Sequence, residues 1–297
     1  MIPHDTLVAL SVSPTAPADM HRRGLSELHL RFVFTELVRH LLAAGACIAY
    51  GGRLDEPADL EPNFTRVMLD MVSGYRPDLR PDDSRLVSFA SATVWADDDP
   101  ARLAAYQQIV ATYQGRFQVE QCPAAPLQAV AAQPATQAVL ALTSMREQMA
   151  AQCAARVVIG GRLDKYAGRY PGVIEEAILT VGSVGTAGRP CALYVVGGFG
   201  GGGAALAAHL AGESPPELTQ QWQLDNVPAA RELAPLLADT PYALQLDADL
   251  ATALPPGNWA ALRNGLTDAN NQRLATTTDV DEVVALVLRG LHTIAAR

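Results

Sequence analysis

The sequence predicts an α/β fold: a Rossmann-like, doubly wound, mostly parallel sheet with helices on both faces. Short apolar runs typical of buried strands alternate with longer segments typical of helices over nearly the whole chain. Two of the expected strands end in the same tripeptide, Gly-Gly-Arg, at residues 51–53 and 160–162. Because ligands of doubly wound sheets bind beyond the carboxyl ends of the strands, we expect both turns to face one crevice.

The amino-terminal half supplies three expected strands and three expected helices. Residues 6–13 (TLVALSVS) are typical of a strand, and the amphipathic segment at residues 27–44 predicts a helix that ends at Gly45, a common helix terminator. The polar, Pro-containing segment between them, residues 14–26, carries the basic cluster His-Arg-Arg at residues 21–23 and is expected to be a loop. The other elements expected here are strands at residues 46–50 and 86–95 and helices at residues 64–75 and 100–113.

The carboxyl-terminal half continues the alternation. A Pro- and Ala-rich stretch near residues 122–135 is a possible insertion or linker in what we expect to be a single domain covering residues 1–297. The β-branched run at residues 157–159 predicts a buried strand, and a helix is expected to begin near Pro171 or Gly172. The other expected elements are strands at residues 192–196 and 242–246, an Ala-rich helix up to residue 212, and helices at residues 137–155, 229–238 and 281–297.

The composition favours a globular protein and argues against several classes of partner. Of the 297 residues 49% are hydrophobic, and the formal net charge is -9, which disfavours a nucleic acid or an anionic membrane as the main partner. The four cysteines form no C-x-x-C pair and no signal peptide is visible, so we expect a cytoplasmic protein with reduced thiols and no metal site. The uncharged run at residues 191–212 is long enough to span a membrane, but its central glycines favour a strand, a turn and a helix.

Residues 157–177 carry the strongest functional signal in the chain. A strand, a glycine turn and a helix amino terminus in succession bring unpaired N–H groups and the positive end of a helix dipole together, which favours a phosphate or another anion. Arg162 adds a forked cation suited to phosphate oxygens. Glu175 and Glu176 could accept hydrogen bonds from ribose hydroxyls, act as an acid or base on a glycosidic bond, or simply favour the helix terminus. The motif predicts a nucleotide-sized ligand.

The order of the motifs resembles the SLOG superfamily, which includes the Lonely Guy enzymes. The resemblance rests on a first strand ending in small polar residues, a Tyr-Gly-Gly turn, a helix with Met and Arg, and a second Gly-Gly turn before a helix with paired glutamates. The chain departs from the enzymes' PGGxGTxxE motif, since Ile159 replaces the proline and Arg162 follows the glycines, and from the spacing of their M-x-x-R-K motif. These departures resemble the branch that senses nucleotide-derived signals in prokaryotic immunity. One member is the SLOG domain of the Thoeris effector, which binds a cyclic ADP-ribose isomer.

The resemblance implies a ligand site assembled from several strand ends. Gly160, Gly161 and Arg162 would cradle phosphate, and Glu175 and Glu176 would bracket a ribose. In a hydrolase of the Lonely Guy kind, both glutamates and Arg146 would be catalytic. The other implied ligand-binding residues are Ser11, Ser13, Gly51, Gly52, Arg53, Arg146, Gly172, Gly198, Phe199 and Gly200.

Three classes of function remain open from the sequence. The leading one is a binding or sensor domain for a nucleotide-derived signal, such as a cyclic ADP-ribose isomer or ADP-ribose, in a prokaryotic defence system. Such a domain would form a homo-oligomer, by default a dimer, or act through a separate or fused effector. The alternatives are a nucleoside 5′-monophosphate phosphoribohydrolase and a scaffold that has lost its pocket. Gly198, Gly200 and Gly203 also satisfy G-x-G-x-x-G, but a dehydrogenase usually places that motif in its first strand–helix–strand unit. No cofactor is expected beyond the ligand itself.

Overall fold

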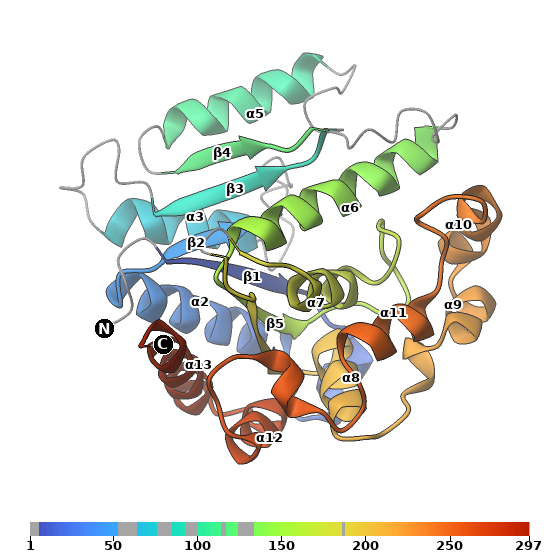
Figure 1. Cartoon of the computed structure of the whole chain (residues 1–297). Coiled ribbons are helices and arrows are strands. Elements are labelled where there is room, and N and C mark those ends of the chain that lie inside the picture. The colour runs from blue at the N-terminus through green and yellow to red at the C-terminus, as the bar shows by residue number, and fades with distance from the viewer. Residues whose placement is uncertain are drawn as a thin grey trace.

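A parallel sheet forms the centre of the molecule (Figure 1). The structure, a computed structural model, describes residues 6–52, 64–75, 85–92, 100–113, 117–123, 134–185 and 188–296. Within these residues the sheet has six strands in the order β4-β3-β2-β1-β5-β6, and every neighbouring pair is parallel. The strands are β1 (Leu7–Ser13), β2 (Cys47–Tyr50), β3 (Leu86–Ala90), β4 (Gln118–Gln121), β5 (Ala155–Gly160) and β6 (Ala192–Val196).

The direction in which strands are added to the sheet reverses at β1. The chain moves outward from β1 to β4 and then returns, so that β5 pairs with the free side of β1. The pairing is long, with Val8 opposite Ala155 and Ser13 opposite Gly160. The topological switch point therefore lies between the carboxyl ends of β1 and β5, and the predicted doubly wound α/β fold is confirmed.

Helices cover both faces of the sheet, and the alternation of side chains along β1 shows why. Val8, Leu10 and Val12 point into a core shared with α2 and α13, whereas Ala9 points into a separate core beneath α6. On that second face α7 and α8 pack over β5 and β6. The helices involved are α2 (Glu27–Ala43), α3 (Phe64–Tyr75), α5 (Pro100–Thr112), α6 (Pro134–Gln152), α7 (Gly172–Gly182), α8 (Gly201–Leu210) and α13 (Val280–Ala295).

The carboxyl-terminal third adds short helices around α7 and α8 (Figure 1). Leu246, Leu250 and Trp259 contribute to the core formed by α7, α8 and the last two strands. These elements are α9 (Gln220–Asn226), α10 (Pro228–Leu237), α11 (Leu246–Ala253), α12 (Asp268–Thr276) and two short 3-10 helices, Pro216–Leu218 and Trp259–Leu262. Among the helices that the structure describes, none has the length and hydropathy that a membrane crossing requires.

Three expectations about local structure need correction. Residues 14–26 are not only a loop, because α1 (Pro17–Arg22) forms there with a proline at its start, a position that proline favours. The polar edge strand β4 was not anticipated. Residues 242–246 are not a strand: the Gln245 N–H donates to the Tyr170 hydroxyl at 2.8 Å, and α11 begins at the next residue. Most of the expected linker, residues 124–133, lies outside the described residues.

Candidate functional site

The glycine turn after β5 connects the ends of β1 and β5 to the start of α8. Gly160 and Gly161 have φ angles of 65° and 100°, a region that favours glycine. A Cβ atom on Gly161 would lie 2.7 Å from the Val173 side chain of α7. The Gly161 N–H donates to the Ser13 carbonyl oxygen at 3.0 Å, and the Gly161 carbonyl accepts from the Gly202 N–H at 2.9 Å. The turn thus holds the amino end of α8 beside the switch point.

A cleft of about 500 Å³ opens next to this turn. Its walls come from α1, the loop after β5, the first turns of α8 and the segment at residues 213–222. Three arginines line the cleft, Arg22, Arg23 and Arg162, together with the indole of Trp222. The volume is that of a typical small-molecule site, and the position beyond the strand ends is where doubly wound folds bind their ligands.

The carboxylate of Asp19 organises one wall of the cleft. Its oxygens accept hydrogen bonds from the Gly201 N–H at 2.8 Å, and from Arg22 and Arg23 at 3.3 and 3.4 Å. Burial alone would raise the pKa of this carboxyl group, but the backbone N–H and the arginines outweigh it and hold the pKa below its usual value. Asp19 is therefore charged at neutral pH and partly neutralises the arginines beside it.

Arg162, another lining residue, makes a forked contact with Asp164. Its Nε and Nη2 atoms each lie 2.8 Å from one oxygen of that carboxylate. The hydrogen bond from Arg162 lowers the pKa of Asp164. Both side chains are partly exposed, at 35% and 52%, so the pair is accessible to a ligand. Glu213 and Glu217 add two further carboxylates to the lining.

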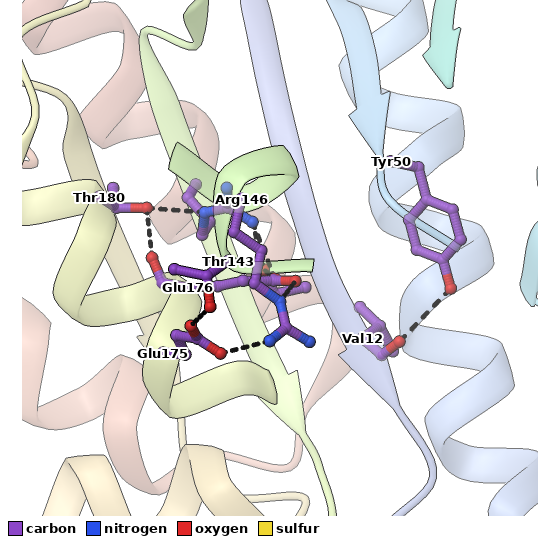
Figure 2. Close-up of polar contacts among 9 residues, drawn as sticks. Val12, Tyr50, Thr143, Arg146, Glu175, Glu176 and Thr180 are labelled. Carbon is purple, nitrogen blue, oxygen red and sulfur yellow. Dashed lines mark hydrogen bonds and ion pairs between the residues drawn. The ribbon is translucent and has the colours of Figure 1, made fainter. Parts of the chain in front are cut away.

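Glu175, by contrast, does not line the cleft, and Figure 2 shows its carboxylate directed at Thr143 and Arg146. Its side chain is fully buried, and its two oxygens accept hydrogen bonds from the Thr143 hydroxyl at 2.6 Å and from the Arg146 guanidinium. Burial opposes the charge on Arg146, but Glu175 and Glu176 outweigh it and raise the pKa of the guanidinium. The loop before α7 packs onto this ion pair, since a Cβ atom on Gly168 would lie 2.2 Å from Arg146.

Glu176 connects this ion pair to the strands β5 and β1. Its oxygens accept from Arg146 at 3.3 Å, from Arg156 at 2.8 Å and from the Ser11 hydroxyl. Arg156, the second residue of β5, is itself fully buried and also donates to Thr180 and Ser11, each at 2.7 Å. All four oxygens of the two glutamates therefore have protein donors. We call these connected side chains the ion cluster; its members are Ser11, Thr143, Arg146, Arg156, Glu175, Glu176 and Thr180. The ion cluster links α6, α7, β1 and β5, and none of its residues belongs to the described lining of the cleft.

The comparison with protein families decides the identity of the fold. The family model of SLOG cluster2 matches residues 3–274. The chain belongs to the SLOG cluster2 family. Searches of curated proteins and of solved structures return no match. The resemblance stated from the sequence motifs is thereby confirmed at the level of the superfamily.

The second glycine turn of this SLOG domain lies at the same edge of the sheet as the first, because β1 pairs with both β2 and β5. A Cβ atom on Gly51 would lie 2.9 Å from Met145 of α6, and one on Gly52 would lie 2.0 Å from the Tyr50 ring. Close packing therefore requires the glycine at position 52, whereas a side chain at position 51 would only displace the flexible end of Met145. Neither glycine belongs to the described lining of the cleft. Arg53 lies outside the described residues, so its proposed contact with ligand stays a prediction.

The glycines after β6 serve close packing in the SLOG domain. A Cβ atom on Gly198 would lie 2.0 Å from the Thr277 carbonyl oxygen, and the Phe199 side chain is fully buried. Gly200 has a φ of 82° and leads into α8. Only its neighbour Gly201 reaches the described lining of the cleft.

Several lining residues were not singled out from the sequence as ligand-binding. Asp19, Arg22, Arg23 and Trp222 lie in segments expected to be loops or left unassigned. One signal was available: two adjacent arginines follow the end of the first strand, which is the strand at the switch point. Of the residues that were singled out, the cleft contains Gly161 and Arg162.

Proposed function

We propose that this SLOG domain binds a nucleotide-derived ligand in the cleft at the switch point. The observation that carries the proposal is the presence of three arginines, Arg22, Arg23 and Arg162, around one cavity at the carboxyl ends of β1 and β5. Guanidinium groups bind phosphate oxygens through paired hydrogen bonds, and they do so even in a protein of net negative charge. Phosphate groups of the ligand are assigned to these side chains.

The remaining lining suits the other parts of a nucleotide. Carboxylates accept hydrogen bonds from ribose hydroxyls, and Glu213 and Glu217 supply such groups. The Trp222 indole offers an apolar face against which a base can stack. A ligand with a base, ribose and more than one phosphate would use each of these features. ADP-ribose and its cyclic isomers are the members of this class that the family resemblance suggests, as signals in a prokaryotic defence system.

A binding role is favoured over hydrolysis by the state of the paired glutamates. A general acid or nucleophile for a glycosidic bond must be free to reach the substrate. In this domain every oxygen of Glu175 and Glu176 accepts a hydrogen bond from the protein, and Glu175 is fully buried. We therefore assign the ion cluster a structural role and the cleft the binding role.

Calorimetric titration with ADP-ribose, cyclic ADP-ribose and AMP tests the proposal. Arg162→Ala should raise the Kd of the tightest ligand about tenfold or more, because a hydrogen bond to a charged group contributes about 1.5–3 kcal/mol. Arg273→Ala is the matched control, since Arg273 pairs with Glu282 on α13 and does not line the cleft. Binding weaker than ~1 mM for every ligand would remove the proposal. Release of base from AMP, detected by chromatography, would favour the hydrolase instead.

We further propose that the domain forms a homodimer through the free face of α2. Leu28 and Phe32 lie one turn apart on this helix and are 72% and 56% exposed. An antiparallel contact with the α2 of a second copy would bury this apolar pair. A separate or fused effector is the other output that the family resemblance suggests.

A further inference from the structure

The amino end of α8 is occupied by a carboxylate from another element. The Oδ2 atom of Asp19, on α1, lies 2.8 Å from the Gly201 nitrogen at the first position of α8. This is the position at which helices commonly bind external anions. In this domain the Asp19 carboxylate, an anion of the protein itself, fills this position, and it lies inside the cleft assigned to the ligand.

The backbone around this carboxylate is shaped to admit an anion. Gly200 and Gly201 both have positive φ angles, 82° and 59°. A Cβ atom on Gly200 would lie 2.5 Å from the Asp19 carboxylate and 3.2 Å from Arg23 Nε. A side chain at this position would therefore displace the anion. The two glycines keep open a seat formed by the Gly201 N–H and the guanidinium groups of Arg22 and Arg23, which we call the anion seat.

The donors of the anion seat would serve a phosphate better than they serve Asp19. The carboxylate has one charge and lies at 3.3 and 3.4 Å from the two arginines, which is long for charge-assisted hydrogen bonds. A terminal phosphate has up to two charges and three acceptor oxygens, so it can contact all three donors at once. The arginine side chains are 75% and 39% exposed and can rearrange around it.

Asp19 can leave the seat without unfolding α1. Its side chain is 22% exposed, so a rotation about its own bonds would bring the carboxylate to solvent. Met20, the next residue, is fully buried in the main core and anchors the helix. The arginines that follow it would thus remain at the cleft while the carboxylate moves out.

We propose that Asp19 is an internal competitor for the ligand: it occupies a phosphate subsite made of the Gly201 N–H, Arg22 and Arg23, and a phosphate of the ligand displaces it. The inference rests on the proposed function and deepens it. The competition raises the ligand concentration that binding requires. If a site is open only a fraction of the time, its apparent Kd rises by the inverse of that fraction. A seat that is occupied by Asp19 about nine-tenths of the time raises the Kd about tenfold.

Calorimetry with ADP-ribose on wild type, Asp19→Asn and Asp19→Ala tests the competition. Both variants should bind about tenfold more tightly than wild type, since the occupant of the seat is lost or loses its charge. Asp225→Asn is the matched control: it removes one negative charge from α9, next to the cleft segment that carries Trp222, and Asp225 is exposed and does not belong to the described lining of the cleft. We expect this control to tighten binding less than threefold.

A second measurement follows the seat directly in the wild-type protein. Addition of pyrophosphate should shift the amide signal of Gly201 in a ¹⁵N-labelled sample, and wild type and Asp19→Asn should converge on the same bound position. An unmoved Gly201 signal, or Asp19 variants that bind ADP-ribose no better than Asp225→Asn, would overturn the competitor role while the proposed function stands. Absence of ADP-ribose binding in wild type and in both variants would overturn both.

Discussion

Replacement of Glu176 by glutamine is expected to destabilise the fold strongly. Glu176 accepts from Arg146, Arg156 and Ser11, and Arg156 is fully buried in β5. The substitution keeps the shape of the side chain but removes the only carboxylate that Arg156 contacts in the described residues. Loss of one partner from a buried ion pair typically costs about 3–5 kcal/mol. Because Arg156 keeps its bonds to Thr180 and Ser11, we expect the lower end, about 3 kcal/mol.

Urea unfolding followed by far-UV circular dichroism measures this loss. A change of about 3 kcal/mol corresponds to a fall in Tm of roughly 6–12 °C. Glu213→Gln is the control, because Glu213 is exposed on the cleft and should change the free energy of unfolding by less than about 0.5 kcal/mol. The double variant Arg156→Met/Glu176→Gln should be more stable than the sum of the single effects by at least ~1 kcal/mol.

The opposite outcome would refute this reasoning. Acids placed for function often cost stability, so a ligand-contacting glutamate can be replaced with little loss or with a gain. If Glu176→Gln is as stable as wild type but loses ligand binding, the ion cluster is part of the ligand site and the structural assignment is wrong. A coupling free energy of zero between Arg156 and Glu176, measured from the single and double variants, would contradict the structural assignment as well.

Three further predictions concern the turn, α2 and Asp19. Gly161→Ala should lower the free energy of unfolding by about 1–3 kcal/mol, because φ is 100° and the new Cβ would lie 2.7 Å from Val173; a neutral result in urea unfolding would contradict the turn geometry. Glutamate at both Leu28 and Phe32 should convert the proposed dimer to monomer in analytical ultracentrifugation, and an unchanged sedimentation coefficient would place the interface elsewhere. The pKa of Asp19 is lowered on folding, so its charge stabilises the fold above the usual pKa of 3.8, and this stabilisation is lost as the pH falls through the folded value. The stability difference between wild type and Asp19→Asn should accordingly be constant from pH 7 to about pH 5 and shrink in more acidic urea titrations; a difference that grows on acidification would reverse the assignment.

The strands at the centre of the sheet were predictable because their sequences leave few alternatives. The run Val157–Val158–Ile159 followed by two glycines suits a strand buried on both faces, and it became β5. The edge strand β4 reads Gln-Val-Glu-Gln and is polar, so nothing in its composition distinguishes it from a loop. The prediction of a strand at residues 242–246 was wrong for another reason. Its apolar residues pack individually, with Tyr242 near the Arg169 guanidinium and Leu246 at the start of α11.

The candidate site was only partly predictable, because the sequence does not show which acids are already paired. Gly161 and Arg162 line the cleft, since a glycine turn after a buried strand constrains its own neighbourhood, and their contact with a ligand stays a prediction. The role of Glu176 depends on Arg156, which lies 20 residues earlier and immediately before the β-branched run of β5. A charged residue within so apolar a strand was a signal that a buried carboxylate had to pair with it. Asp19 and Trp222 come together only through the tertiary fold.

Photolabelling with 8-azido-ADP-ribose tests the central claim most directly, because the azide marks the residues next to the base. If the ligand binds in the cleft, the label should appear in the segment at residues 213–222 that contains Trp222, and excess ADP-ribose should prevent it. Labelling confined to peptides of α6 and α7, around Arg146 and Glu175, would contradict the assignment and place the nucleotide at the ion cluster.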